Sequence, residues 1–206
     1  RVPAEELALL RVLHVAQGLQ EVLRRDLART EWDFSAPLFP RAVRQRRVLH
    51  VHVSDVPGIE QNTGALGHGL PIAVGTAMAA KMDEKDFRVF TLLGDGELAE
   101  GSNWEAAMAA AHYDLDNLIA IIDHNTLQIT GRTRDVCSNE PLDEKFAAFG
   151  WHVRTINGHS IPELTDALSA RGGGGGGGGG GGKPQVVIAN TVKGRGISFM
   201  EDVAKW

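Results

Sequence analysis

The hydrophobic residues of this chain fall into runs with two different spacings, one helical and one extended. Between residues 4 and 30, leucines and valines recur every three or four positions, which predicts an amphipathic helix. Residues 48–53 alternate apolar side chains with two histidines, which fits either a short strand or an extended approach to a site. Farther along, short runs rich in Leu, Ile and Val alternate with helix-like segments.

These later runs predict a regular succession of elements. Helices are expected up to Met82 and over 102–113, 143–149 and 161–169, and strands over 87–93, 118–122, 151–156 and 185–191. Alternation of this kind is typical of parallel sheets, because a parallel connection needs a crossover long enough to hold a helix. We therefore expect an α/β fold in which a parallel sheet carries helices on both faces.

The chain is long enough for a single domain. Its 206 residues can bury a full core, and we expect one domain over 1–206. Eleven consecutive glycines occupy 172–182. Such a run cannot bury apolar surface or keep a fixed shape, so we interpret it as an engineered linker or as placeholders for unidentified residues.

Charge and cysteine content narrow the class of protein. Lys and Arg number 21 against 26 Asp and Glu, and this net charge of −5 gives no reason to expect nucleic acid or a membrane as partner. The single cysteine, Cys137, excludes an intramolecular disulfide and fits a reducing compartment. No apolar run approaches the ~20 residues that a membrane helix needs, so a soluble, cytoplasmic protein is expected.

Polar residues stand where two of the predicted strands end. The strand over 87–93 runs into Gly94-Asp95-Gly96, and 28 residues separate Gly96 from Asn125, which follows the strand over 118–122. Each motif alone would usually be a turn or a helix cap. Because the interval fits one helix and one strand, Asp95 and Asn125 are expected at the ends of adjacent parallel strands, on the edge where ligands bind. Side-chain oxygens beside bare backbone N–H groups suit a hard divalent cation held with a diphosphate.

Three longer segments carry a resemblance to a known family. GDGELAEGSNWEAAMAAAHYDLDNLIAIIDHNTLQITGRT resembles the thiamine-diphosphate motif of transketolases, in which GDG is followed after about thirty residues by Asn. TGALGHGLPIAVGTAMAAK looks like the Gly-rich helix start of that family, and KPQVVIANTVKGRGISFMEDVAKW like the segment that closes its first domain. The resemblance covers about residues 48–206 and is closest to two-gene transketolases. It implies a thiamine-diphosphate-binding fold, with this chain as the diphosphate-binding domain.

The resemblance also implies a set of metal ligands. Asp95 and Asn125 would bind Mg²⁺ or Ca²⁺ through their side chains, and Leu127 would bind it through its carbonyl oxygen. Two diphosphate oxygens and a water would complete the octahedron that Mg²⁺ demands.

The same resemblance implies further cofactor contacts. Gly96 N–H would touch the diphosphate, Ile129 would pack beneath the thiazolium, and the remaining cofactor-binding positions would be Gly64, Leu66, Gly94 and Glu97. Glu100 matches the acid that links two cofactor sites across the family's dimer. Alternatively, Glu100 could simply favour the first turn of the following helix through the helix dipole.

The histidines give less specific indications. His50 or His52 occupies the place of a family histidine that contacts cofactor and substrate, and the spacing favours His50 as the catalytic one. His68 replaces a Gln common at its place, where it could cap the following helix. His124 stands beside Asn125 and could equally be a solvent-facing turn residue.

The resemblance implies ketol transfer that needs a second chain. Residues 1–47 match the family poorly, and the pyrimidine-binding domain has no counterpart here. A two-carbon ketol unit would pass from a ketose or ketose phosphate to an aldose, with a partner subunit supplying the pyrimidine domain in a heterotetramer or dimer of heterodimers. Alternatives are a deoxyxylulose-phosphate synthase, an α-keto-acid dehydrogenase α subunit, or a catalytically silent binding or assembly module.

Overall fold

The computed structural model describes residues 65–169 and 182–205. The helix predicted over 4–30, the segment 48–53 and all but the last of the eleven glycines lie outside these residues.

A four-stranded parallel sheet forms the centre of the described fold. Its strands are β1 (Val89–Gly94), β2 (Leu118–His124), β5 (His152–Asn157) and β6 (Gln185–Asn190), in the order β1-β2-β6-β5. The two inner strands, β2 and β6, are almost wholly buried and apolar, as expected where helices cover both faces. Because every pairing is parallel, all four strands end on the same edge of the sheet.

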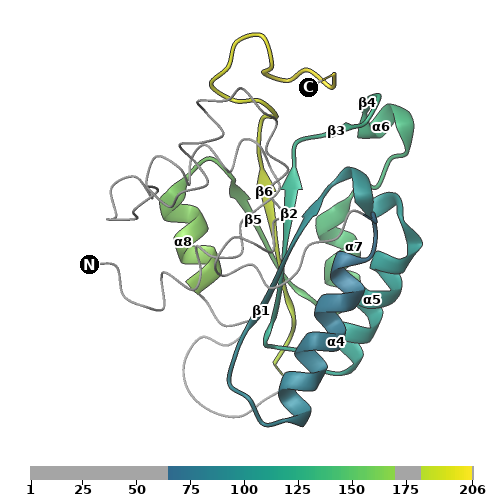
Figure 1. Ribbon diagram of the computed structural model, residues 1–206, viewed down its shortest axis with the longest axis vertical. Coiled ribbons are helices and arrows are strands. Elements are labelled where there is room, and N and C mark those ends of the chain that lie inside the picture. The colour runs from purple at the N-terminus through teal and green to yellow at the C-terminus, as the bar shows by residue number, and fades with distance from the viewer. Residues whose placement is uncertain (1–64, 170–181, 206) are drawn as a thin grey trace, which may run out of the picture.

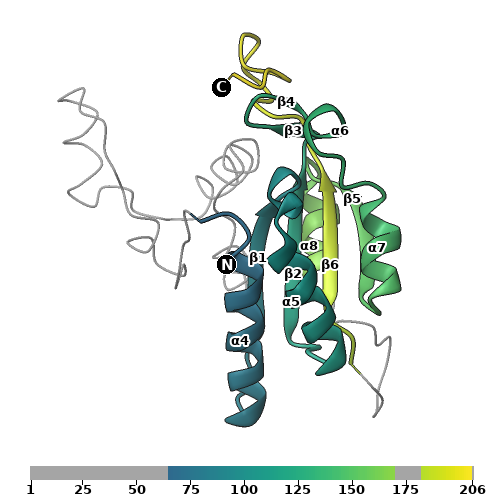
Figure 2. The ribbon, with the colours of Figure 1, turned by 90° about the vertical axis from the view of Figure 1, so that its right-hand side faces the viewer.

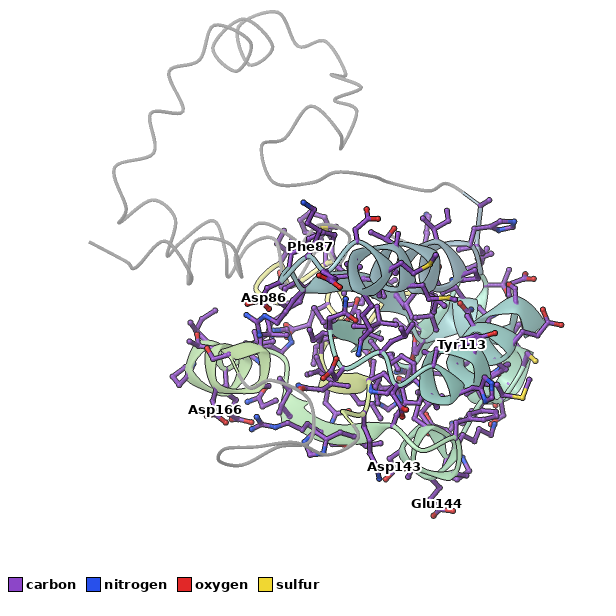
Figure 3. All side chains as sticks on the ribbon, turned by 90° about the horizontal axis from the view of Figure 1, so that it is seen from below. Asp86, Phe87, Tyr113, Asp143, Glu144 and Asp166 are labelled. Carbon is purple, nitrogen blue, oxygen red and sulfur yellow. The ribbon has the colours of Figure 1, made fainter. Side chains whose placement is uncertain are left out.

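Helices lie on both faces of this sheet, as predicted. Three of them, α4 (Gly69–Met82), α5 (Gly101–His112) and α7 (Leu142–Ala148), pack on one face, and α8 (Ile161–Ser169) packs on the other (Figure 1). The buried sides of α4 and α5 are mostly alanine, which lets the two helices approach each other and the sheet closely. In the helices on the outer surface, the charged side chains Asp143, Glu144 and Asp166 point away from the sheet (Figure 3).

An aromatic cluster joins α5 and α7 to the start of β5. The ring of Phe146 lies 5.4 Å from that of Trp104 and 5.3 Å from that of Trp151, both measured between centroids. The indole N–H of Trp151 donates to the carbonyl of Ala107 at 2.9 Å, so the cluster has no unpaired indole at its buried end. This packing fixes the helix layer whose upper end leads to the polar edge of the sheet.

The predicted elements agree with the observed ones within a few residues, but four short elements were missed. They are the 3₁₀-helix η2 (Gly96–Ala99), the two-stranded ribbon β3 (Leu127–Gln128) and β4 (Gly131–Arg132), and α6 (Thr133–Val136). They lie together with the C-terminal segment beyond the strand ends (Figure 2). Elements of two to four residues are too short to show a period, so hydrophobic spacing could not reveal them. None of the helices in the described part of the chain is long and apolar enough to span a membrane.

Candidate functional site

The ends of β1 and β2 are adjacent, as the spacing of the two motifs predicted. Gly94 pairs with Asp123 in the parallel register, and the Asp95 N–H donates to the Asp123 carbonyl at 3.2 Å. Asp95 and Asn125 therefore both leave the sheet at the same edge.

The side-chain oxygens of Asp95 and Asn125 are held by consecutive peptide groups. The Thr126 N–H donates to Asp95 Oδ2 at 2.6 Å, and the Leu127 N–H donates to Asn125 Oδ1 at 2.9 Å. Thr126 adopts a left-handed conformation with φ of 61°, which turns the chain tightly enough to present both N–H groups. The structure thus brings together Asp95, Asn125 and Leu127, the three residues predicted to bind a metal.

The carboxyl group of Asp95 is buried at this edge. Only 3% of the residue is exposed, and burial raises the pKa of Asp95 to about 6, although the Thr126 and Gly96 N–H groups and the charge of His124 oppose that rise. A buried carboxylate whose charge is poorly compensated is costly, and a bound cation would remove that cost.

The 3₁₀-helix after Asp95 brings Gly96 and Glu97 to the same place. A Cβ on Gly96 would meet the Cβ of Gln128 at 3.0 Å, so a larger residue would crowd the ribbon that follows Asn125. Burial raises the pKa of Glu97 to about 7. The side-chain oxygen of Gln128 is buried, and no hydrogen-bond partner for it is found among the described residues. Polar groups thus gather here that a polar ligand would satisfy.

The Gly-rich segment meets the start of α5 beside this edge. Gly67 has φ of 81°, and a Cβ there would come within 2.6 Å of the Cβ of Glu100, so glycine is required. The hydroxyl of Ser102 donates to the Gly67 carbonyl at 2.7 Å. Glu100 is the N-cap residue of α5, but its side chain makes no capping hydrogen bond. Its position also suits the interpretation that its charge favours the first turn of the helix.

The other predicted residues are distributed as follows. Leu66 and Ile129 are exposed, at 51% and 78%, and Ile129 lies in the turn between β3 and β4. His50, His52 and Gly64 lie outside the described residues. His68 precedes α4 but does not cap it through its side chain: its Nδ1 donates to the Leu66 carbonyl at 3.1 Å.

His124 is not a solvent-facing turn residue. Its Nδ1 contacts Asn190 Oδ1 at 2.7 Å and its Nε2 contacts Glu140 Oε1 at 2.8 Å. Burial by itself would lower the pKa of His124, but its hydrogen bonds to Asn190 and Glu140 and the nearby carboxylates raise it. The side chain therefore ties the end of β2 to the end of β6.

Sequence reasoning missed several residues that support the site. Asp123 accepts hydrogen bonds from Asn125 Nδ2, at 3.0 Å, and from the Thr191 hydroxyl. Arg132 forms a two-pronged ion pair with Asp202 and also donates to the Thr126 hydroxyl at 3.0 Å. The partners are far apart in the sequence, so no local motif indicates them.

The oxygen atoms at this edge fit a hard cation. No three His, Cys, Asp or Glu side chains are grouped as metal ligands in the described ranges. The candidate donors are instead one carboxylate, one amide oxygen and one main-chain carbonyl, which is the chemistry that Mg²⁺ and Ca²⁺ prefer. Asp95, Asn125 and Leu127 therefore fit the ion that the sequence predicts.

Residues 41–204 match the family described as "Transketolase, thiamine diphosphate binding domain". The chain is 49% identical over 152 residues to one of the named subunits of an apulose-4-phosphate transketolase from Phocaeicola vulgatus, covering 74% of this chain and 52% of that protein. It is 53% identical over 150 residues to the subunit of the same name from Actinobacillus succinogenes, covering 73% and 52%.

A solved structure shows the same fold. The transketolase of Campylobacter jejuni aligns with a TM-score of 0.65 and 36% identity over 73% of this chain and 24% of that one. The chain spans about half the length of the two apulose-4-phosphate transketolase relatives, and a smaller part of the Campylobacter jejuni protein.

Proposed function

Since the chain belongs to the transketolase family, in the part that forms the thiamine diphosphate binding domain, we propose that it binds thiamine diphosphate and serves in ketol transfer. In this proposal a two-carbon ketol unit passes from a ketose, or ketose phosphate, to an aldose. The observation that carries the proposal is the pair of oxygens, from Asp95 and Asn125, held on consecutive N–H groups at adjacent strand ends.

Each predicted site residue has a role in this proposal. Asp95, Asn125 and the Leu127 carbonyl would hold Mg²⁺ against the diphosphate. The cofactor-binding group comprises Gly64, Leu66, Gly94, Gly96, Glu97 and Ile129, and the catalytic group His50 and Glu100. When bound, thiamine diphosphate would supply the electron sink for cleaving the carbon–carbon bond beside the ketose carbonyl.

The protein's own contribution would be to position and shield the cofactor. The N-terminal end of η2 places N–H groups where a diphosphate would lie, and buried Asp95 supplies the negative charge that attracts the cation. The exposed apolar side chains of Leu66 and Ile129 are available to cover an apolar part of the cofactor. Ordering them against the ligand would exclude water from the reacting atoms.

A partner subunit is part of the proposal. The two apulose-4-phosphate transketolase relatives are each named as one subunit of their enzyme, and this chain spans about half of their length. We infer that a second chain carries the pyrimidine-binding domain, in a dimer of heterodimers, because the described fold holds a cation-and-diphosphate edge without a second thiamine-binding domain.

The test compares the chain with and without a co-purified partner, supplied with thiamine diphosphate, Mg²⁺, a ketose phosphate and an aldose. Ketol transfer is expected from the pair and not from the chain alone. Equal rates from the isolated chain would contradict the division between subunits. Turnover of pyruvate in place of a ketose would replace ketol transfer by the chemistry of another thiamine enzyme.

A further inference from the structure

The amide group of Asn125 has two neighbours of opposite kinds. Its Nδ2 donates to Asp123 Oδ2 at 3.0 Å, and its Oδ1 accepts the Leu127 N–H at 2.9 Å. A carboxylate can only accept hydrogen bonds, and a peptide N–H can only donate. A rotation of the amide by half a turn would set donor against donor and acceptor against acceptor, so only one orientation is satisfied.

The orientation decides whether Asn125 can bind a cation. The oxygen and the NH₂ group of an amide are nearly the same size, so packing distinguishes them poorly. Mg²⁺ and Ca²⁺ bind the oxygen, whereas an NH₂ group has no lone pair to offer them. Some neighbouring group must therefore choose which end faces the ion.

Asp123 is itself held in place from the end of β6. Its Oδ1 accepts the hydroxyl of Thr191, and the Thr191 N–H donates to the His124 carbonyl at 3.1 Å. One oxygen of the Asp123 carboxylate is thus bound by the segment that follows β6, and the other is left to receive the Asn125 NH₂ group. Asp123 also leads straight into the turn, since it pairs with Gly94 next to Asp95.

We propose that Asp123, held by Thr191, is a positioning residue that orients the Asn125 amide with its oxygen toward the cation of the cofactor. The inference rests on the proposed function, because that function supplies the cation. Asp123 acts here through its hydrogen bond and not as a ligand, since its two oxygens are engaged by Asn125 and Thr191. Orienting groups of this kind typically change metal affinity by about 10- to 100-fold.

The choice of substitutions separates orientation from charge. Asp123→Ala removes the acceptor and frees the amide to rotate. Asp123→Asn removes the negative charge but keeps an oxygen that can accept the Asn125 NH₂ group, while its own NH₂ can donate to the Thr191 hydroxyl. Thr191→Val keeps the shape of the side chain and leaves Asp123 in place without its support. Asn157→Ala, at the end of β5, is a matched control because its side chain makes the same local turn.

The metal experiment uses the full chain with saturating thiamine diphosphate and Mn²⁺ as the probe, with free Mn²⁺ followed by electron paramagnetic resonance. Affinity is expected to fall about tenfold or more in Asp123→Ala and about threefold in Thr191→Val. It should stay within about threefold of the unaltered protein in Asp123→Asn, and unchanged in Asn157→Ala. Equal loss in Asp123→Asn and Asp123→Ala would overturn orientation in favour of charge. Unaltered affinity in Asp123→Ala would overturn the inference altogether.

A second measurement needs no metal and detects the amide itself. In the ligand-free protein, the two side-chain N–H signals of Asn125 should be well separated and slow to exchange, and Asp123→Ala should bring them toward the values of a free amide. An unchanged spectrum in a folded Asp123→Ala protein would contradict the inference, whatever the binding data show. Absence of cofactor-dependent Mn²⁺ binding by the unaltered protein would instead overturn the proposed function, together with the cation that this inference requires.

Discussion

The ends of β2 and β5 lie on either side of β6 and begin with the same local turn. At each, an asparagine oxygen accepts the N–H two residues later: Asn125 from Leu127 at 2.9 Å, and Asn157 from His159 at 3.0 Å. This arrangement is a common way for Asn to turn a chain. The turn alone therefore says nothing about a ligand.

What differs is the destination of the chain and the chemistry around each asparagine. After Asn157 the chain enters α8, Glu163 of that helix accepts the Asn157 N–H, and Gly158 packs so closely on β6 that a Cβ would lie 2.5 Å from Thr191 Cγ2. His159 Nε2 accepts the Val192 N–H at 2.7 Å. The end of β5 is thus closed by structural contacts.

The end of β2 is built around carboxylates instead. Asn125 lies between Asp123 and the oxygen-binding N–H groups of Thr126 and Leu127, and buried Asp95 stands beside it on β1. The chain continues into a short ribbon rather than a helix, so the oxygens face the edge of the sheet. The comparison teaches that neighbouring charges, rather than the asparagine turn, distinguish a candidate site from a connection.

The largest expected effect comes from removing each asparagine side chain. Asn125→Ala deletes a proposed ligand and should lower cofactor-dependent Mg²⁺ affinity on the order of 100-fold or more, since loss of a ligand should exceed loss of an orienting group. Asn157→Ala should leave that affinity unchanged, because its turn holds no charge. Isothermal titration calorimetry at fixed thiamine diphosphate measures both. Similar losses in the two variants would erase the distinction between the strand ends.

The buried carboxylate beside β2 predicts a dependence of stability on pH. Because the pKa of Asp95 is raised from 3.8 to about 6, its burial favours the protonated folded state, and ligand-free stability falls as pH rises from about 4 through about 6. Asp95→Asn keeps an acceptor for Thr126 without the charge. It should stabilise the ligand-free protein by about 3 kcal/mol at pH 8 and hardly at all at pH 4.

Denaturant unfolding at both pH values, without metal, checks this prediction. Glu97, whose pKa is also raised, is present in both proteins and cancels in the difference. The same variant should lose cofactor-dependent Mg²⁺ binding. A stability difference that does not change with pH would contradict the assigned role of burial.

The smallest expected effect concerns the ion pair that joins the ribbon after β2 to the C-terminal segment. Asp202→Ala removes the partner of Arg132, which also contacts the Thr126 hydroxyl, and should weaken Mg²⁺ binding about two- to fivefold by loosening the turn. Exposed ion pairs contribute little to stability, so unfolding should hardly change. Asp166→Ala, which removes the partner of Arg154 beside β5, is the matched control. A greater loss of Mg²⁺ affinity in this control would contradict the special role of the β2 end.

The candidate site was predicted to different depths at these two strand ends. Spacing alone placed Asp95 and Asn125 on adjacent strands, because one helix and one strand fill the interval between them. It gave no indication of Asp123, Thr191 or Asp202, since their partners come from other segments. The sequence also could not separate a solvent-facing His124 from the half-buried one that links Asn190 and Glu140.

Hydrophobic periodicity by itself determined the α/β fold, the parallel sheet and the edge on which the polar residues meet. Period and alternation are local properties, and burial on both faces leaves a long, readable signal in β2 and β6. Only the tertiary structure decided which carboxylate is buried, which way the Asn125 amide points, and which strand end is closed by a helix. Those outcomes depend on contacts between residues such as Asp123 and Thr191, which come together only when β2 and β6 pair.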